Sequence, residues 1–212
     1  MKISAALLAI LCCAASGARP AHAQASRFDA TVPRARQIQL AMSAAPSEIS
    51  SGATIYVLGA HGFERARVGR NSFSCLVDRF VENGVAKSLE PKCFDGEGTR
   101  TLLPVSLRTE ALRAEGRSED AINADIVAGY KSGRFRAPHK PGLIYMMSRY
   151  NILARGPNNT DFGHVAGHLM FYAPYMTLRD LGYQSATKGM LPILADPGTP
   201  YTMMIVVPRR QL

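Results

Sequence analysis

The chain has 212 residues, with 25 Lys and Arg against 16 Asp and Glu, so its formal net charge is +9 with neutral histidines. This length suits one domain with a sizeable hydrophobic core. The cations are scattered along the chain, which favours a solvated basic surface and argues against nucleic acid as a partner.

Residues 1–23 contain the three parts of a secretory signal peptide in order. Lys2 supplies the positive charge, residues 4–15 form an apolar stretch too short to cross a bilayer, and Ala21-His22-Ala23 is a small-x-small cleavage site. We therefore expect export, a mature chain of residues 24–212 and a secreted or periplasmic location; the alternative is a buried N-terminal helix. No later run approaches the length of a membrane span, so no transmembrane segment is expected.

Two cysteines remain after the leader, Cys75 and Cys93. In an oxidising compartment two thiols favour a disulfide bond, with two free buried thiols as the alternative.

The N-terminal part of the mature chain predicts one helix and then a three-stranded meander. Ile38, Met42 and Ala45 repeat with helical spacing after Pro33, so the helix covers about residues 33–45. Three runs rich in β-branched and aromatic residues follow, separated by glycine-containing turns, at residues 53–58, 63–68 and 73–79.

Residues 80–101 predict irregular structure. Asp95 and Glu97 lie there in a glycine-rich stretch and could ligate a hard cation, but the spacing is not that of an EF-hand, and a plain turn is the simpler interpretation. Two helices are predicted next, the first over residues 102–115 and the second over residues 118–131, the latter beginning at the N-cap Ser118.

The C-terminal part predicts strands separated by a loop and a short helical turn. The strands are expected at residues 142–147, 167–172, 190–194 and 202–207, with a loop over 151–163 and a turn of helix over 177–181. About seven strands and three helices that do not alternate indicate a single α+β domain over residues 24–212 with a largely antiparallel sheet.

The densest apolar stretch of the mature chain, residues 163–176 (GHVAGHLMFYAPYM), carries His164 and His168. On a helix, histidines four apart could bind one metal ion, but the glycines favour a strand, where the two rings lie too far apart to share one. No metal site is therefore expected. We expect Phe171 of this strand to be buried in the core.

At HLMFYAPY (168–175) and DPGTPYTMMIVVP (196–208) the chain resembles a group of uncharacterised secreted bacterial proteins, and RTLLP (100–104) and residues 134–142 also fit the pattern. The resemblance covers nearly the whole mature length. It implies a secreted bacterial protein of one domain, and it implies no activity, cofactor or site residue.

Familiar catalytic signatures are absent from the sequence: there is no GxSxG, HExxH, P-loop or CxxC motif, and no cofactor is indicated. His168 is the leading candidate for a catalytic or ligand-binding residue, because it precedes an apolar strand beside Gly167. His164 and Asp161 are weaker catalytic candidates. Arg100, His139 and Tyr201 are possible ligand-binding partners in a cleft.

Three functions from different classes are compatible with these features. The first is a binding or interaction module for a small molecule or an anionic envelope component. The second is a hydrolase-like enzyme centred on His168, with Asp161 or Glu97 as its partner. The third is a protein held to anionic envelope polymer by its positive charge alone. We favour the first.

Overall fold

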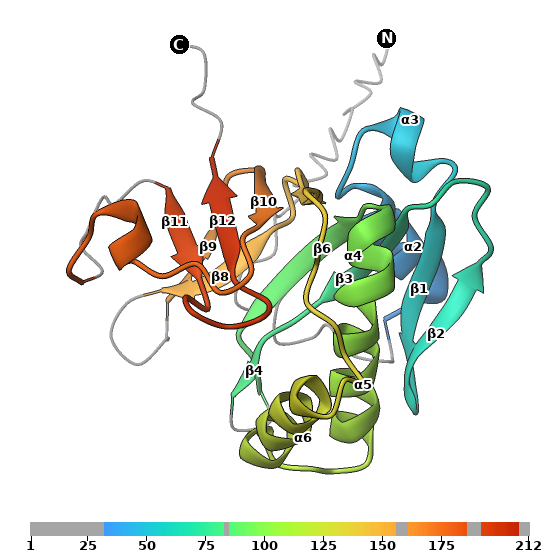
Figure 1. The fold of residues 1–212 in the computed structure, drawn as a ribbon. Helices are drawn as coiled ribbons and strands as arrows, with labels where there is room; N and C mark the ends of the chain where they lie inside the picture. Colours follow the sequence, from blue (N-terminus) through green and yellow to red (C-terminus); the bar gives the residue numbers. More distant parts are fainter. Residues whose placement is uncertain (1–31, 83–84, 156–160, 186–191, 208–212) are drawn as a thin grey trace, which may run out of the picture.

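The structure is a computed structural model that describes residues 32–82, 85–155, 161–185 and 192–207. The predicted signal peptide therefore lies outside the described residues. Ten strands form one sheet of order β11-β12-β10-β7-β6-β3-β1-β2, with β8 joined to β6 and β9 joined to β8 (Figure 1). The strands of this sheet are β1 (Thr54–Gly59), β2 (Gly62–Arg67), β3 (Ser74–Asp78), β6 (Ser88–Phe94), β7 (Leu143–Met146), β8 (Ile152–Arg155), β9 (Asp161–His164), β10 (His168–Tyr172), β11 (Ile193–Ala195) and β12 (Met203–Val206).

The described helices include the three predicted ones. They are α2 (Arg34–Met42), α3 (Ser47–Ser50), α4 (Gly96–Thr101), α5 (Leu103–Ala114) and α6 (Glu119–Lys131), with a 3-10 turn η2 (Arg179–Leu181). A separate pair of short strands, β4 (Val81–Glu82) and β5 (Val85–Ala86), forms a small hairpin. The α+β class is confirmed, and all described pairings are antiparallel except that of β1 with β3.

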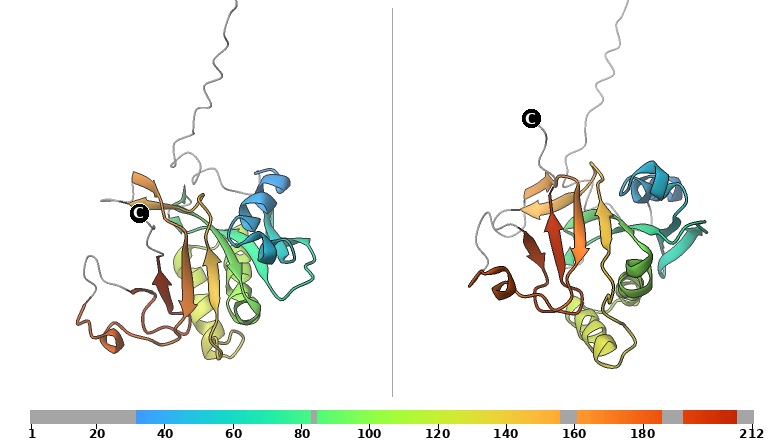
Figure 2. Two further views of the ribbon diagram at one scale, coloured as in Figure 1. Left: turned by 90° about the horizontal axis from the view of Figure 1, so that it is seen from above. Right: turned by 45° about the horizontal axis from the view of Figure 1, so that its top comes forward.

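Helices cover both faces of the sheet (Figures 1 and 2). On one face Leu40 and Ala41 of α2 pack in a cluster with Ile55 and Cys75. On the other face the residues at the α4–α5 junction pack against Leu76, Phe94 and Ile144. The helix α6 lies outside α5, and the two helices share a smaller core. The disulfide between Cys75 and Cys93 joins directly opposed residues of β3 and β6, so the predicted pairing is confirmed.

The predicted meander over residues 53–79 is wrong in its third strand. Instead of continuing beside β2, β3 pairs in parallel with the far side of β1, Ile55 lying opposite Cys75. The chain crosses back over the start of β1 to reach this position. Gly69 makes the crossing possible, because a Cβ atom there would lie 2.3 Å from the backbone nitrogen of Thr54.

Five described strands lie where the sequence predicts irregular structure or a loop: β4, β5 and β6 within residues 80–101, and β8 and β9 around residues 151–163. The strand β6 lies between β3 and β7 in the sheet, yet its sequence SLEPKCF places Glu90 and Lys92 among apolar residues. Both polar side chains face the α5 side and are held there by ion pairs. The strand therefore lacks the alternation of buried apolar and solvent-exposed polar residues from which a strand is predicted. The loop predicted over residues 151–163 is likewise wrong where the structure describes it, because β8 and β9 pair antiparallel; residues 156–160 of that prediction lie outside the described residues.

The strand β10 forms where a strand is predicted, and it lies between β7 and β12 in the sheet. Met170 and Tyr172 pack against the cluster beneath α4 and α5, whereas Phe171 points to the opposite face and is only partly buried. The expectation that Phe171 is a core residue is therefore wrong. In the part of the chain that is described, no helix has the length and apolar composition required to span a membrane.

Candidate functional site

His168 ties the start of β10 to the preceding loop. Its side chain is 6 % exposed, and its Nδ1 lies 2.9 Å from the carbonyl oxygen of Ala166. Gly167 allows close approach, because a Cβ atom there would lie 2.9 Å from the carbonyl oxygen of Met147. His168 lines none of the three cavities described below. These contacts account for the buried position of His168, and its role as a functional residue stays a prediction.

The weaker catalytic candidates lie on a different strand from His168. Asp161 begins β9 and His164, which is exposed, ends it opposite Ile152. The prediction that His164 and His168 lie on one strand is therefore wrong, since residues 165–167 separate β9 from β10. Among the described residues, no group of three or more His, Cys, Asp and Glu is placed to hold a metal ion.

Arg100 and His139, by contrast, come together at the buried carboxylate of Glu97. Nη2 of Arg100 lies 2.9 Å from Oε2 of Glu97, and Nδ1 of His139 lies 2.9 Å from Oε1. The backbone N–H of His139 also donates to Oε1. Only 4 % of the Glu97 side chain is exposed, whereas 70 % of the His139 side chain is. From its buried position, the Glu97 carboxylate therefore orients the exposed side chains of Arg100 and His139.

The local sequence explains how Glu97 reaches this position. Asp95 is the N-cap of α4, and its Oδ1 accepts hydrogen bonds from the backbone of Gly98 and from the hydroxyl of Tyr172. Its Oδ2 accepts the N–H of Leu143 at 2.9 Å. This single carboxylate fixes the start of α4 against β7 and β10. Glu97 then occupies the first helical turn, where a negative charge is favourable, and Arg100 follows three residues later.

His139 comes from the segment that follows α6. Gly133 ends α6 in the left-handed region, with φ of 77°, as a C-terminal glycine does. The chain then turns back so that Phe135 packs on Gly129, where a Cβ atom would lie 2.4 Å from the ring. Arg134 and Arg136, on either side of Phe135, are thereby brought to the end of α4.

These segments enclose a cavity of about 340 Å³, which we call the basic pocket. Three guanidinium groups and one imidazole line it, and no carboxylate does so among the described residues. Glu97 and Asp125 bind Arg100 and Arg134 from outside this lining. The lining residues are Arg100, Thr101, Pro104, Arg134, Phe135, Arg136 and His139.

The hydrogen bond from the His139 backbone N–H lowers the pKa of Glu97, although burial opposes this effect, and Arg100 lowers it further. The pKa of Asp125 is also lowered, mainly by its hydrogen bonds from Arg108. Both carboxylates are therefore ionised near neutral pH and hold their arginines in fixed positions. An arginine held in this way keeps further N–H donors for a ligand, because the guanidinium has five.

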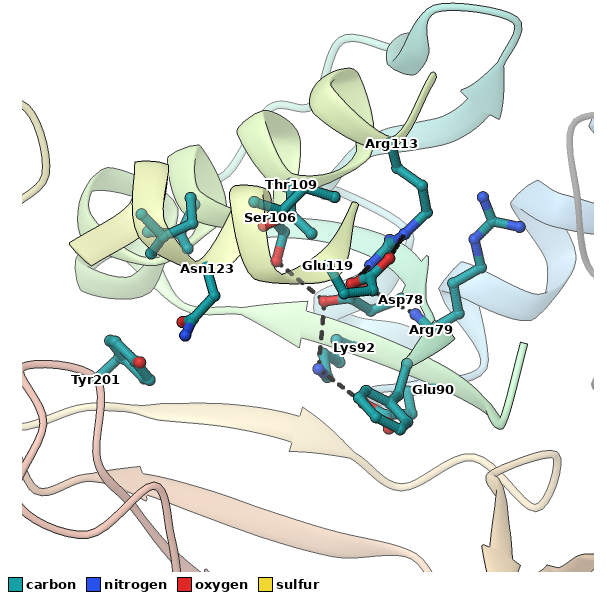
Figure 3. Close-up of a pocket in the computed structure, with 14 residues that line it drawn as sticks. Asp78, Arg79, Glu90, Lys92, Ser106, Thr109, Arg113, Glu119, Asn123 and Tyr201 are labelled. Carbon is teal, nitrogen blue, oxygen red and sulfur yellow. Dashed lines mark hydrogen bonds and ion pairs between the residues drawn. The ribbon is translucent and has the colours of Figure 1, made fainter. Parts of the chain in front are cut away.

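A second cavity, of about 330 Å³, lies between the sheet and helices α5 and α6 (Figure 3). We call it the ion-pair cavity, because Nζ of Lys92 lies between Oδ2 of Asp78 at 3.2 Å and Oε2 of Glu90 at 2.8 Å. Ser106 of α5 donates a hydrogen bond to the same Oδ2 of Asp78. At the other end of the cavity lies Tyr201.

Lys92 stays charged in this cavity. Burial opposes its charge, but the Asp78 and Glu90 carboxylates outweigh burial and raise the pKa of Lys92. Burial likewise favours protonation of Asp78, but Lys92 and hydrogen bonds from Arg79 and Ser106 lower its pKa. A lysine held protonated cannot serve as a general base for Ser106. The cluster therefore offers fixed hydrogen-bonding groups.

Tyr201, like His168, lies away from Arg100 and His139 and does not line the basic pocket. It lines the ion-pair cavity and also a third cavity of about 300 Å³, which we call the tyrosine pocket. The lining of this pocket is Val127, Tyr130, Lys131, Tyr175, Thr199, Pro200 and Tyr201.

Comparison with known protein families, curated proteins and solved structures finds no match.

Sequence reasoning named Arg100 and His139 but missed Arg134 and Arg136 of the same pocket. The available signal was local: two arginines flank Phe135, so they extend to the same side of the chain when the aromatic ring is buried. From the sequence, Asp161 or Glu97 is the predicted partner of His168, whereas in the structure Glu97 contacts His139.

Proposed function

We propose that this protein is a secreted or periplasmic binding module whose basic pocket recognises a carboxylate or phosphate group. One observation carries the proposal: Arg100, Arg134, Arg136 and His139 converge on one cavity that no described carboxylate lines. The guanidinium group matches carboxylates and phosphates in bidentate geometry. Thr101, Pro104 and Phe135 add a less polar wall for the remainder of a small ligand.

Arg136 has the greatest unused capacity to bind an anion. Within the described residues it has no ion pair, whereas Arg100 is held by Glu97 and Arg134 by Asp125. An anion that enters the pocket therefore neutralises Arg136 and completes the hydrogen bonding of the other two arginines. Desolvation inside a concave site makes such charge-assisted bonds stronger than on an open surface.

The extracellular or periplasmic setting is part of the proposal. The Cys75–Cys93 disulfide is compatible with an oxidising compartment, and the leader-like residues 1–23 support export. The resemblance to secreted bacterial proteins points to the same setting. In that setting an anionic group can belong either to a free metabolite or to an envelope component.

Calorimetric titration of the mature chain with inorganic phosphate and with succinate tests the proposal. We expect saturable binding, and we expect an Arg134→Ala/Arg136→Ala double variant to weaken it by at least about tenfold, or about 1.4 kcal/mol. Arg65→Ala is the matched control, because Arg65 is an exposed arginine of β2 that does not line the pocket. Equal losses in both variants, or no binding by either anion, would overturn the proposal.

Vesicles distinguish the two sources of the anion. If the ligand is an envelope component, vesicles of phosphatidylglycerol should bind the wild type at physiological salt, and phosphatidylcholine vesicles should not. Binding of the two small anions without vesicle binding would identify a free ligand. General attraction to the basic surface would fade with salt and would not depend on the pocket arginines.

A second candidate function, hydrolysis of an anionic ester, is favoured by the arrangement of His139. Its Nδ1 is held by the buried carboxylate of Glu97, which leaves Nε2 on the exposed side of the ring. This is the arrangement of a general base, which would take a proton from water as the water oxygen attacks the ester and return it to the leaving oxygen. Release of 4-nitrophenol from its phosphate ester, lost in His139→Gln, would support an enzyme; no release would leave the binding function alone.

A further inference from the structure

The tyrosine pocket combines aromatic rings from three separate parts of the chain. Tyr130 comes from α6, Tyr175 follows β10, and Tyr201 precedes β12. The rings of Tyr130 and Tyr201 lie 5.5 Å apart between centroids at an interplanar angle of 35°. Val127 and Pro200 extend the apolar wall, and Lys131 is the only charged side chain among the lining residues.

The walls of this pocket are held in place by backbone hydrogen bonds. Tyr175 has φ of 64°, in the left-handed region that bulky residues rarely adopt, and its N–H donates to the carbonyl oxygen of Thr199 at 2.7 Å. The hydroxyl of Thr202 donates to the carbonyl of Asp196 at 2.7 Å and accepts the N–H of Thr199 at 3.0 Å. The Tyr175 side chain nevertheless stays 61 % exposed. A fixed backbone thus presents an exposed ring to the pocket.

A polar group at the pocket has no partner. The hydroxyl of Tyr130 is buried and makes no hydrogen bond to any described residue. Burial raises the pKa of Tyr130, so the hydroxyl remains a protonated donor. A buried donor without a partner is destabilising, and a ligand oxygen that reaches the Tyr130 hydroxyl would satisfy it.

The adjoining ion-pair cavity restricts the kind of ligand. It meets the tyrosine pocket at Tyr201 and along α6, where Ile126 lines one cavity and Val127 the other. Its lining has equal numbers of acidic and basic side chains, Asp78, Glu90 and Glu119 against Arg79, Lys92 and Arg113. Such a lining offers many donors and acceptors but no net charge, which favours a neutral polyhydroxylated ligand over an ion.

We propose that the tyrosine pocket and the ion-pair cavity together bind a neutral saccharide. The apolar C–H face of one sugar ring stacks on Tyr175 and Tyr201, while hydroxyl groups of the adjacent ring reach Asn123 and the Lys92 cluster. Lys131 at the tyrosine pocket disfavours quaternary ammonium ligands, for which an aromatic cage without a cation is suited. This site is separate from the basic pocket, so the two can be tested independently.

The chain contains no tryptophan and eight tyrosines, three of which line the tyrosine pocket, so a ligand that contacts these rings should change the tyrosine fluorescence. The mature protein is titrated with maltose, cellobiose and N,N′-diacetylchitobiose, and binding is followed by fluorescence and by NMR amide shifts. We expect at least one disaccharide to bind with a Kd of about 1 mM or tighter, with shifts at residues of α6 and the 199–201 turn. Tyr175→Ala, which removes an exposed ring, should weaken binding by about tenfold.

Two further variants keep the test specific. Tyr150→Ala removes a ring that packs at the α2 face, outside both cavities, and should bind the disaccharide as the wild type does. Asn123→Ala should weaken disaccharide binding without changing the affinity for 4-methylphenol, a probe of the aromatic pocket alone. Binding of 4-methylphenol but of no disaccharide, or equal disaccharide affinity in wild type and Tyr175→Ala, would overturn the proposal.

Discussion

The buried carboxylate of Glu97 receives both the backbone N–H and the ring Nδ1 of His139, two contacts of 2.9 Å across 42 positions of sequence. It thereby joins the first turn of α4 to the segment that follows α6. The basic pocket forms where these two segments meet, so its geometry depends on an ionised Glu97.

Glu97→Gln should lower the free energy of unfolding by about 1–3 kcal/mol at neutral pH, because the donors around it lose a charged acceptor. The pKa of Glu97 is lowered in the folded state, so its contribution is present above the usual value of 4.5 and is lost as pH falls below it. Urea unfolding between neutral and acidic pH should show a weaker acid destabilisation in the variant. Glu48→Gln, at an exposed position of α3, should retain the wild-type pH dependence.

The Asp78–Lys92 pair should be strongly coupled. Lys92→Met leaves the Asp78 carboxylate without its cation in a mostly buried position, which we expect to cost about 3–5 kcal/mol. Adding Asp78→Leu to Lys92→Met should recover part of this loss. A double-mutant cycle by chemical denaturation measures the coupling, and additive losses would show that the pair does not act as a unit.

Glycine at position 98 should be required for stability, because the hydroxyl of Tyr172 leaves no room for a side chain there. A Cβ atom at position 98 would lie 2.2 Å from Oη of Tyr172 and 3.1 Å from its Cζ. Gly98→Ala should therefore destabilise the protein by about 1–3 kcal/mol through overpacking. In a Tyr172→Phe background the same substitution should cost less, since the nearest atom is gone. An equal cost in both backgrounds, measured by thermal and urea unfolding, would contradict this explanation.

The Cys75–Cys93 disulfide should be formed in the exported protein. The intact mass should match a chain that begins at Gln24, and no thiol should react with an alkylating reagent before reduction. Replacing both cysteines by alanine should lower the free energy of unfolding by about 3 kcal/mol on the chain-entropy account. Two alkylated thiols in the unreduced protein would contradict the bond, and an N-terminus other than Gln24 would contradict the cleavage site.

His168 and His139 should respond differently to the same substitution. His168→Gln should lower stability by about 1–3 kcal/mol, since a buried side chain loses its contact with the Ala166 carbonyl. Phosphate affinity should be unchanged. His139→Gln should leave the melting temperature close to wild type, because the ring is mostly exposed, and should weaken phosphate binding. If His168→Gln instead kept its stability and lost phosphate affinity, His168 would be a functional residue.

Features that depend on short stretches of sequence could be predicted from the sequence. The helices α2, α5 and α6 follow from apolar spacing, and α6 also from Ser118 as its N-cap. Gly116 and Gly133 mark the ends of α5 and α6. The disulfide follows from the count of two cysteines outside the leader. These are local or compositional properties, so no knowledge of distant contacts is needed.

Other features depend on contacts between distant residues, and only the tertiary structure decided them. The strand β6 contains Glu90 and Lys92, whose burial becomes favourable only when Asp78 of β3 lies beside them. The parallel placement of β3 depends on the path across Gly69. Glu97 meets His139 instead of His168 because Asp95 fixes α4 and Phe135 turns the later segment back onto α6. Each depends on side chains far apart in sequence, whose pairing offsets a burial cost that no single segment reveals.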